Sequence, residues 1–353
     1  MSNASNLPFP KPPSVDFQNL HVGFVGLGNI GFAMAKNLAT NGPKNIPNFP
    51  PVTIWNRTAS KAETLVAEIG KEKAVIAATI EEIVTKCDVI VVNLANDDVV
   101  RVIYSQFCEV LKNHPHNRHK TFVETSTIYP RLAGDLDKMI SVFPRTHLIT
   151  CPVLGAPAAA HKSELILIMS GAYRSKQIVA YLMVPSVGRK VLDLGGDLEK
   201  ALTYKLVANS MILGMNEVMA EALTFAGKSG IGSQRVLDLV KDFFPVPSMM
   251  AYADRMAHEK FDGSTGFSID GGIKDAQHIR RLTTMYNCPM PTIDVAHQNL
   301  LTARAHFLRQ KNEGKAKVDT LDWSAIITGT RASAGLGPLD RSEDAALVEI
   351  EES

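Results

Sequence analysis

The sequence lacks any excess of charge of one sign. Its 353 residues include 37 lysines and arginines against 36 aspartates and glutamates, which gives a formal net charge of +1. Such a chain has no global field to attract phosphates, so neither nucleic acid nor an anionic membrane surface is indicated as a partner. The sequence also has no apolar run long enough to predict a membrane span. These absences leave small molecules and other protein chains as the expected partners.

Cysteine is scarce and dispersed. The four cysteines, Cys87, Cys108, Cys151 and Cys288, lie far apart without Cys-x-x-Cys spacing. We therefore expect reduced thiols, and neither a disulfide framework nor a metal site. The histidine-rich segment 114–119 lies between a predicted helix and a predicted strand, with no carboxylate or thiol beside it. It is interpreted as a solvated turn rather than a metal site.

The two terminal segments differ in composition from the rest of the chain. Residues 1–18 are polar and proline-rich, without the apolar core of a signal peptide or the arginines of a transit peptide. We expect them to be disordered and the protein to be cytoplasmic. Residues 331–353 end in a run dominated by aspartate and glutamate, and we predict a disordered acidic tail.

Between these segments the chain predicts two domains, as its length also favours. Short β-rich runs alternate with helical patterns up to the pair Gly195-Gly196, which is typical of a doubly wound, mostly parallel α/β sheet. The runs are 21–25, 52–55, 89–94, 121–124, 147–152, 165–170 and 190–194. One long helical pattern over 197–228 follows, and further helical patterns continue to about residue 330. We therefore predict a Rossmann domain over 19–196 and an all-helical substrate and dimerisation domain over 197–330.

The first β-rich run leads into a glycine-rich turn that indicates a dinucleotide site. The turn reads Gly26-Leu27-Gly28-Asn29-Ile30-Gly31 and opens the first helix. The first glycine permits the tight turn, the second lets the backbone approach a pyrophosphate, and the third allows close packing of helix and strand. The pyrophosphate is then expected at the helix N-terminus, where N–H groups and the helix dipole favour negative charge. This context makes the Gly-x-Gly-x-x-Gly motif informative.

The end of the second β-rich run indicates which dinucleotide is bound. An NAD site carries an acidic residue there for the ribose 2′-hydroxyl, whereas this sequence offers Asn56, Arg57 and Thr58, with Lys61 one turn further on. A guanidinium and a hydroxyl suit a 2′-phosphate. NADP(H) is therefore the expected cofactor, the alternative for Arg57 being that it stacks on adenine or faces water.

Several segments in fixed order resemble the β-hydroxyacid dehydrogenase family, the relatives of 3-hydroxyisobutyrate and 6-phosphogluconate dehydrogenases. The resemblance covers roughly residues 20–310. The segments are Gly-Phe-Val-Gly-Leu-Gly at 23–28, Trp-Asn-Arg-Thr at 55–58, Glu-Thr-Ser-Thr at 124–127, Pro-Val-Leu-Gly-Ala at 152–156, Lys205-x-x-x-Asn209, and Lys274-Asp275 preceded by Phe267.

The resemblance implies a catalytic lysine on the long helix, and Lys205 occupies that position. Hydride reduction of a carbonyl leaves an alkoxide, which a nearby ammonium can stabilise and protonate. Partial burial would lower the lysine pKa toward neutrality. Asn209 lies one turn along the same helix face, where it can orient the lysine or bind substrate. Solvent exposure of Lys205 on an amphipathic helix is the alternative.

The family pattern also implies further cofactor contacts. Leu94, Ala95, Asn96 and Thr127 are expected near the nicotinamide. Phe267 and Lys274 are expected on the cofactor side of the second domain, although the pair Lys274-Asp275 can equally be a surface ion pair. These are the remaining cofactor residues that the sequence predicts.

The sequence departs from the family at the substrate motif. Members generally carry Ser-Gly-Gly where this chain has Leu154, Gly155 and Ala156. Leu154 cannot hydrogen-bond a carboxylate, although the Gly155 amide still could. The substrate is therefore expected to be bulkier or less anionic than a short 3-hydroxy acid.

The function that these residues predict is NADPH-dependent hydride transfer to a small carbonyl, by a protein that forms at least a dimer. An imine reductase and a non-catalytic NADP-binding scaffold are the alternatives. Imine reductases typically place another residue at the lysine position, and scaffold relatives tend to lose the lysine. Lys205 therefore argues against both.

Overall fold

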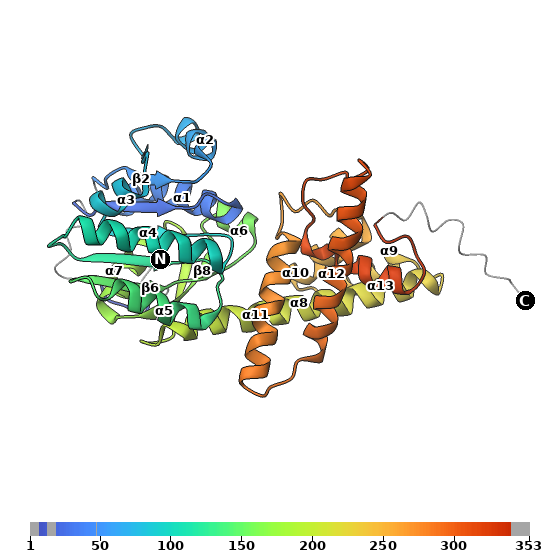
Figure 1. The fold of residues 1–353 in the computed structure, drawn as a ribbon. Coiled ribbons are helices and arrows are strands. Elements are labelled where there is room, and N and C mark those ends of the chain that lie inside the picture. The colour runs from blue at the N-terminus through green and yellow to red at the C-terminus, as the bar shows by residue number, and fades with distance from the viewer. Residues whose placement is uncertain (1–6, 13–18, 47, 340–353) are drawn as a thin grey trace, which may run out of the picture. The chain divides into compact units, whose positions relative to one another are not determined.

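The protein divides into two compact units (Figure 1). The structure, a computed structural model, describes residues 7–12, 19–46 and 48–339. The first unit runs from Met1 to Lys205 and the second from Leu206 to Ser353. The dividing point lies inside helix α8 (Leu198–Lys228) rather than at Gly195-Gly196. The reason is that Leu198 and Leu202, in the first turns of α8, pack into the core of the first unit.

The first unit contains a nine-stranded, mostly parallel sheet, as the sequence predicts. Its order is β3-β2-β1-β4-β5-β6-β8-β7, with β9 paired to β8. All neighbouring pairs from β3 to β6 are parallel, while β8 is antiparallel to β6 and β7. The strands are β1 (Val22–Val25), β2 (Val52–Trp55), β3 (Ala74–Ile76), β4 (Val89–Val92), β5 (Lys120–Glu124), β6 (Thr146–Thr150), β7 (Val153–Leu154), β8 (Leu165–Gly171) and β9 (Gly188–Asp193). The sequence patterns missed β3 and β7, because strands of three and two residues are too short to show alternation.

Helices cover both faces of this sheet, which explains why its central strands are apolar throughout. The helices are α1 (Asn29–Asn45), α2 (Ala59–Ile69), α3 (Ile80–Lys86), α4 (Asp97–Asn113), α5 (Pro130–Ile140), α6 (Pro157–His161) and α7 (Tyr173–Met183). Side chains of α1, α2, α6 and α7 belong to one buried cluster, and those of α3, α4 and α5 to another. The four residues of β1 and the four of β4 are all buried between these two layers.

The strand order reverses direction between β1 and β4. From β1 the chain winds outward through β2 and β3, and it then returns to pair β4 with the other edge of β1. In a doubly wound sheet, ligands bind beyond the carboxyl ends of the strands at such a point. The loops after Val25 and Val92 are therefore where a ligand site is expected.

The second unit is helical in its described part, as predicted. It contains α8 beyond Lys205, together with the 3-10 helix η2 (Trp323–Ile326). Its other helices are α9 (Ser233–Phe243), α10 (Pro247–Ala257), α11 (Ile269–Met285), α12 (Pro291–Asn312) and α13 (Ile327–Ser333). Two isolated β-bridges, Asp262 with Leu321 and Ser268 with Asp322, hold the segment before η2 against the start of α11.

Parts of both terminal segments that the sequence predicts to be disordered are packed in the structure. Phe9 is 8 % exposed and meets the Tyr173 ring edge-on, and the Gln177 amide donates to the carbonyl of Pro10. At the other end, Arg331 and Leu336 are buried. The sequence does not predict these contacts, because composition does not reveal a few anchoring side chains. Residues 1–6, 13–18 and 340–353, and with them most of the predicted acidic tail, lie outside the described residues.

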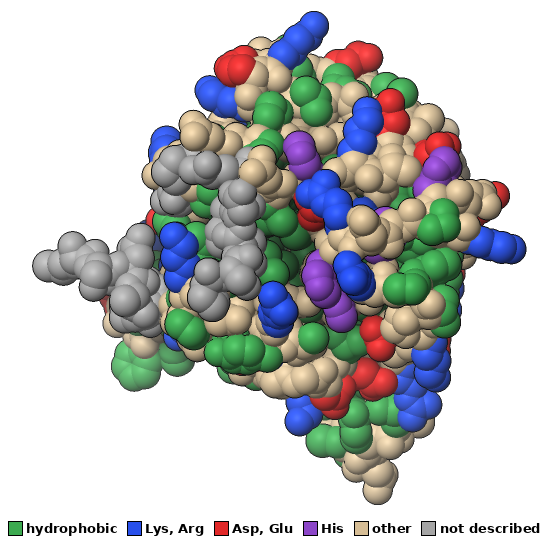
Figure 2. Space-filling view, turned by 90° about the vertical axis from the view of Figure 1, so that its left-hand side faces the viewer, with side chains coloured by type: hydrophobic (Ala, Val, Ile, Leu, Met, Phe, Trp, Pro, Cys, Tyr) green, Lys and Arg blue, Asp and Glu red, His purple; other side chains and the backbone are tan. Residues whose placement is uncertain are grey.

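The surface of the molecule shows mixed charge on the face drawn in Figure 2. Lysine and arginine side chains are interspersed there with aspartate and glutamate, as the near-zero net charge leads one to expect. Within residues 7–12, 19–46 and 48–339, no helix combines the length and apolarity that crossing a membrane requires.

Candidate cofactor site and catalytic residues

The glycine-rich turn lies between β1 and α1 and has the shape that a dinucleotide site requires. Gly26 has φ +98°, and a Cβ there would collide with the carbonyl oxygen of Asn93. A Cβ on Gly31 would collide with the Gly26 carbonyl, so both glycines allow close packing of backbone. Gly28 differs, because a Cβ there would meet nothing within 4 Å. The turn therefore leaves open space at the position where a pyrophosphate would approach.

The beginning of α1 suits an anion in this space. Gly28 is the N-cap residue and supplies no side-chain cap, so Asn29 and Ile30 begin the helix without a side-chain acceptor from the cap. The first turn carries no acidic residue. The N–H groups and the helix dipole both favour a negatively charged ligand here.

Asn56 fixes the glycine-rich turn to the end of β2. Its Oδ1 accepts a hydrogen bond from the Leu27 N–H at 2.8 Å, and its Nδ2 donates to the Thr58 carbonyl at 2.9 Å. Both side-chain groups are thus engaged with backbone. The geometry makes Asn56 a positioning residue that links the turn after β1 to the turn after β2.

The turn after β2 leaves Arg57 and Thr58 at the surface. Both residues are exposed, and Thr58 is the N-cap residue of α2 without using its side chain as a cap. The first turn of α2 contains Lys61 and no acidic residue. A guanidinium, a hydroxyl and a helix N-terminus are the groups that can hold a phosphate.

The loops after β4 and β5 are tied to each other. The Leu94 N–H donates to Ser126 Oγ at 2.7 Å, and the Asn93 amide donates to Thr125 Oγ1 at 3.0 Å. The Ser126 N–H in turn donates to Glu124 Oε1 at 2.7 Å. The backbone on which Leu94 lies is therefore held in place from the next strand.

Glu124, at the end of β5, is fully buried. Burial raises the pKa of its carboxyl group to about 7, and the hydrogen bonds from Ser126 oppose that rise. A buried carboxyl group with a pKa in this range exchanges its proton near neutral pH. Glu124 thus adds a buried titratable group that accepts a hydrogen bond from the loop after β5, at Ser126.

The other residues predicted beside the nicotinamide lie in the same two loops. Ala95 is exposed and Thr127 is half-buried. Asn96 caps α4, since its Oδ1 accepts from the Val99 N–H at 3.0 Å. The side-chain oxygen of Asn96 is therefore already used as the helix cap, which leaves its amide nitrogen for any ligand contact.

The residues predicted to bind substrate follow β6. Leu154 ends β7 and is half-buried, while Gly155 and Ala156 are exposed. Gly155 has φ +145°, and a Cβ there would lie 2.6 Å from Leu165 Cδ2. The glycine is therefore required by the turn itself, whatever its amide binds.

Lys205 lies on α8 within the first unit. The start of this helix is fixed to the end of β6, because Thr150 Oγ1 donates to the Leu198 carbonyl at 2.8 Å. Leu202 is buried in the sheet's core, and Lys205, three residues further on, is half-buried. Since β4, β5 and β6 are parallel, α8 begins at the same edge of the sheet that carries Leu94 and Ser126.

Asn209 lies in the second unit, where it holds an acidic side chain of α11. Its Nδ2 donates to Asp275 Oδ2 at 2.6 Å, and both residues are buried. Asp275 Oδ1 lies 3.1 Å from Lys274 Nζ, whose side chain is 17 % exposed. The three residues form one polar group, so the ion pair of Lys274 is largely buried rather than at the surface.

Phe267 is positioned by η2 rather than by α11. Its N–H donates to Asp322 Oδ2 at 2.8 Å, and its ring meets that of Trp323 edge-on at 4.7 Å. Asp322 is fully buried. The structure thus places Phe267 in a network that the sequence patterns did not reveal.

Several positioning residues were missed from the sequence, namely Asn93, Thr125, Ser126, Glu124 and Asp322. The first four end or directly follow β4 and β5, and a position at the carboxyl end of a strand is a usable signal. Asp322 had no local signal, because its partner Phe267 lies 55 residues away.

The histidine-rich segment lies between α4 and β5, and one of its histidines contacts neighbouring groups of the chain. His114 and His119 are exposed, and His116 contacts the Arg118 carbonyl and Thr146 Oγ1 through its two ring nitrogens. Within the part of the chain that the structure describes, no group of three or more His, Cys, Asp or Glu side chains is arranged to hold a metal ion.

Two family models match the chain in succession. Residues 21–195 match the NAD binding domain of 6-phosphogluconate dehydrogenase. Residues 200–318 match a domain described as NAD-binding of NADP-dependent 3-hydroxyisobutyrate dehydrogenase. Together these matches cover both structural units.

Three curated relatives match over nearly their whole length. An uncharacterized oxidoreductase, YfjR, of Bacillus subtilis is 26 % identical and covers 87 % of this chain and 99 % of its own. The NADH-dependent oxidoreductase ucdB of Aspergillus ustus is 27 % identical over 87 % and 98 %. Glyoxylate/succinic semialdehyde reductase 1 of Arabidopsis thaliana is 25 % identical over 89 % and 99 %.

Solved structures share the fold. A 3-hydroxyisobutyrate dehydrogenase from Salmonella typhimurium superposes with a TM-score of 0.71 and 19 % identity, and it covers 87 % of this chain and 99 % of its own. An imine reductase from Pseudomonas sp. superposes with a TM-score of 0.54 and 18 % identity over 88 % and 99 %. At these identities the likeness concerns the fold alone.

Proposed function

Because the chain belongs to the β-hydroxyacid dehydrogenase family of oxidoreductases, we propose that it reduces a small carbonyl compound with NADPH. The main support for a cofactor site is the open space beside Gly28 at the beginning of α1. The pyrophosphate would lie on the N–H groups of Asn29 and Ile30, and the adenine ribose would lie toward the turn after β2. When bound, the nicotinamide supplies the hydride.

The preference for NADPH rests on the turn after β2. Arg57, Thr58 and the first turn of α2 offer positive charge and hydrogen-bond donors, and no acidic residue stands there to accept from a ribose hydroxyl. The relative from Aspergillus ustus is named as NADH-dependent, so the preference varies among relatives. In this chain the basic turn supports the phosphorylated cofactor.

Lys205 is the proposed proton donor. As the carbonyl carbon gains a hydride, its oxygen becomes an alkoxide, and the ammonium stabilises that charge and transfers one proton to it. The neutral amine then regains a proton from solvent. Lys205 is half-buried and lies three residues beyond the core residue Leu202.

The proposed substrate class rests on Leu154 and on the activity in a relative's name. A relative named glyoxylate/succinic semialdehyde reductase acts on aldehydes by its name. Leu154 replaces the serine that family members generally use for a carboxylate. We therefore propose an aldehyde or ketone that has a bulkier apolar part and less negative charge than a short 3-oxo acid.

Reduction of an imine and a purely structural role as an NADP-binding scaffold are not favoured. Imine reductases typically place another residue at the lysine position, and scaffold relatives tend to lose the lysine. The presence of Lys205 therefore favours carbonyl reduction over imine reduction and over a scaffold role.

We also propose that the protein is a dimer, because α8 carries a row of exposed apolar side chains. Val207, Met211, Val218 and Phe225 are 53–72 % exposed and follow one another at spacings of four and seven residues. Such spacing places them along one side of a helix, which is typical of a helix–helix contact. A second copy of the chain would cover this row.

Single-turnover oxidation of bound NADPH by an aldehyde tests the catalytic proposal. Lys205→Ala should slow this step at least ~100-fold, the low end of what a positioned proton donor contributes. NADPH affinity should change little, since the glycine-rich turn and the turn after β2 hold the cofactor. An unchanged rate in the variant would remove Lys205 from the mechanism and bring the imine and scaffold functions forward.

A further inference from the structure

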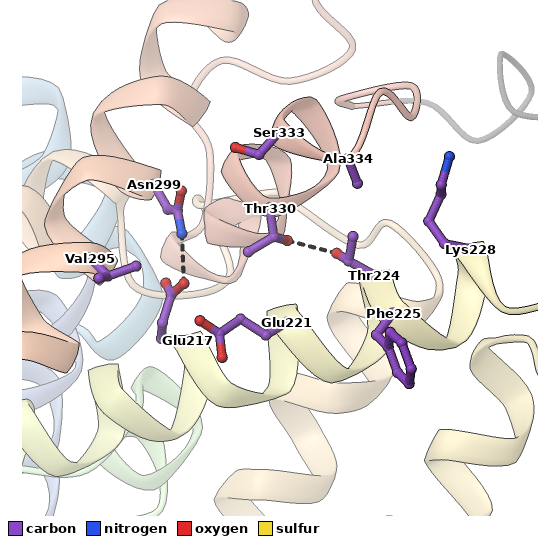
Figure 3. Close-up of a pocket in the computed structure, with 10 residues that line it drawn as sticks. All are labelled: Glu217, Glu221, Thr224, Phe225, Lys228, Val295, Asn299, Thr330, Ser333 and Ala334. Carbon is purple, nitrogen blue, oxygen red and sulfur yellow. Dashed lines mark hydrogen bonds between the residues drawn. The ribbon is translucent and has the colours of Figure 1, made fainter.

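A cavity lined by two acidic side chains lies in the helical unit, apart from all residues assigned to the cofactor. Helices α8, α12 and α13 enclose it, and its volume is about 430 Å³ (Figure 3). Pockets for small molecules typically begin at about 300 Å³, so it can hold a small ligand. Its walls include the acidic residues Glu217 and Glu221 of α8.

Glu217 is a buried carboxyl group with an unused oxygen. The residue is 1 % exposed, and its Oε1 accepts a hydrogen bond from Asn299 Nδ2 at 2.6 Å. Its Oε2 is buried without a hydrogen-bond partner. Leaving such an acceptor unsatisfied costs about 1–3 kcal/mol, or more where the group is charged. A donor supplied by a ligand would remove that cost.

The polar side chains that line the cavity are held in place by contacts with neighbouring residues. A Cβ on Gly329 of α13 would collide with Asn299 Oδ1, so α12 and α13 pack closely at this residue and confine its amide. Across the cavity, the hydroxyl groups of Thr224 and Thr330 lie 2.7 Å apart and hydrogen-bond to each other (Figure 3). Asn299 is therefore fixed before any ligand arrives, as in a preformed site.

The charges around the cavity favour a cation. Glu221, one turn beyond Glu217, directs its carboxylate toward that of Glu217 (Figure 3). The lining residues of α12 and α13 are uncharged; they are Val295, Asn299, Thr330, Ser333 and Ala334. Lys228, at the end of α8, is exposed. Among the described residues of the lining, Lys228 is the one cationic residue, so two carboxylates face one ammonium and the net charge around the cavity is negative.

We propose that this cavity binds a small organic ammonium ion. An ammonium has three N–H donors, enough for Glu217 Oε2, the Glu221 carboxylate and one hydroxyl oxygen. Val295 and Ala334 offer apolar surface for a short alkyl group. A bare metal ion fits less well, since two carboxylates in so large a space do not complete a coordination shell.

The binding should depend on pH through Glu217. Burial raises the pKa of Glu217 to about 7; the Asn299 hydrogen bond opposes the rise, and the charge of Glu221 adds to it. Only the ionised carboxylate pairs with a cation, so affinity rises as the pH rises through 7. Between pH 6 and pH 8 the ionised fraction changes about tenfold, which sets the expected change in Kd.

Ligand-observed NMR titration of the full chain, saturated with NADP⁺, tests the proposal with n-butylammonium chloride as the probe. We expect Kd to fall about tenfold from pH 6 to pH 8 and 1-butanol to bind at least tenfold more weakly. Glu217→Gln, which keeps the shape of the side chain, should raise Kd at least tenfold and abolish the pH dependence. Glu221→Gln, at an exposed position, should raise it about threefold or more. The matched control is Glu109→Gln on α4, which should leave Kd unchanged.

Two results would overturn the proposal. Equal affinity for n-butylammonium in Glu217→Gln, Glu109→Gln and the unmodified chain would show that the carboxyl group holds no ligand. Alternatively, Glu217→Gln could halve the mass in light scattering and leave Kd unchanged. That result would indicate that the Glu217 carboxyl group forms an ion pair with a lysine or arginine of a second copy of the chain. Neither result bears on Lys205, whose test uses NADPH oxidation.

Discussion

The Asn56 side chain holds the backbone of Leu27, at a distance of 2.8 Å from Oδ1 to the amide nitrogen. This one contact joins the turn after β1, where the pyrophosphate is expected, to the turn after β2, where the adenine ribose is expected. Asn56 and its neighbour Arg57 therefore have different tasks, although they are adjacent in sequence. We propose that Asn56 shapes a site common to NADH and NADPH, and that Arg57 faces the ribose group that distinguishes them.

Arg57→Ala should weaken NADPH binding by about 1–3 kcal/mol, the scale for a lost hydrogen bond to a charged group, and leave NADH nearly unchanged. Fluorescence titration with both cofactors measures this difference. Asn56→Ala is the matched comparison, because it should weaken both cofactors equally. Equal losses for both cofactors in Arg57→Ala would contradict a role at a 2′-phosphate.

Asn209→Ala should lower both the turnover and the stability of the protein. Without the amide, Asp275 Oδ2 loses its 2.6 Å hydrogen bond inside the helical unit, at a cost of about 1–3 kcal/mol in the free energy of unfolding. Urea denaturation measures the loss. The double variant Asn209→Ala/Asp275→Ala should lose less than the sum of the two single variants, because they share one interaction. Strict additivity would argue against the contact.

Glu124 should make the protein less stable as the pH rises from 4.5 toward 7. Its pKa is about 7 in the folded chain against 4.5 as the ordinary value, so the unfolded chain releases its proton first. The folded state then binds more protons, and the free energy of unfolding falls across this interval, by up to about 3 kcal/mol, and levels off above pH 7. Glu124→Gln should lack this component when urea denaturation at pH 5 and pH 7.5 is compared. An identical pH dependence in both proteins would contradict the raised pKa.

Light scattering should give at least twice the chain mass of 38.4 kDa at micromolar concentration. Met211→Asp should shift the protein toward the single-chain mass, because it places a charge in the exposed apolar row of α8, where Met211 is 72 % exposed. Val102→Asp on α4, at a position 57 % exposed, is the control and should leave the mass unchanged. A single-chain mass for the unmodified protein would refute the dimer.

The sequence by itself determined the features that repeat locally. Alternating β-rich and helical patterns predicted the parallel sheet, and the long pattern over 197–228 predicted α8 within one residue of its bounds. The glycine-rich turn could also be predicted, because Gly26 and Gly31 are required by backbone that a Cβ on either residue would meet. Local periodicity and turn chemistry record such constraints directly.

Only the tertiary structure decided which polar side chains meet. Asn209 and Asp275 are 66 residues apart, and Asn299 and Glu217 are 82 residues apart. Neither pair has a sequence signal, because side chains so distant are brought together by the packing of helices whose amphipathic patterns specify a buried side but not a partner. The same reason explains why Glu217, an ordinary glutamate in the middle of a helical pattern, is a buried acid on the wall of a cavity. Its burial is set by α12 and α13, which the chain reaches only some 80 residues later.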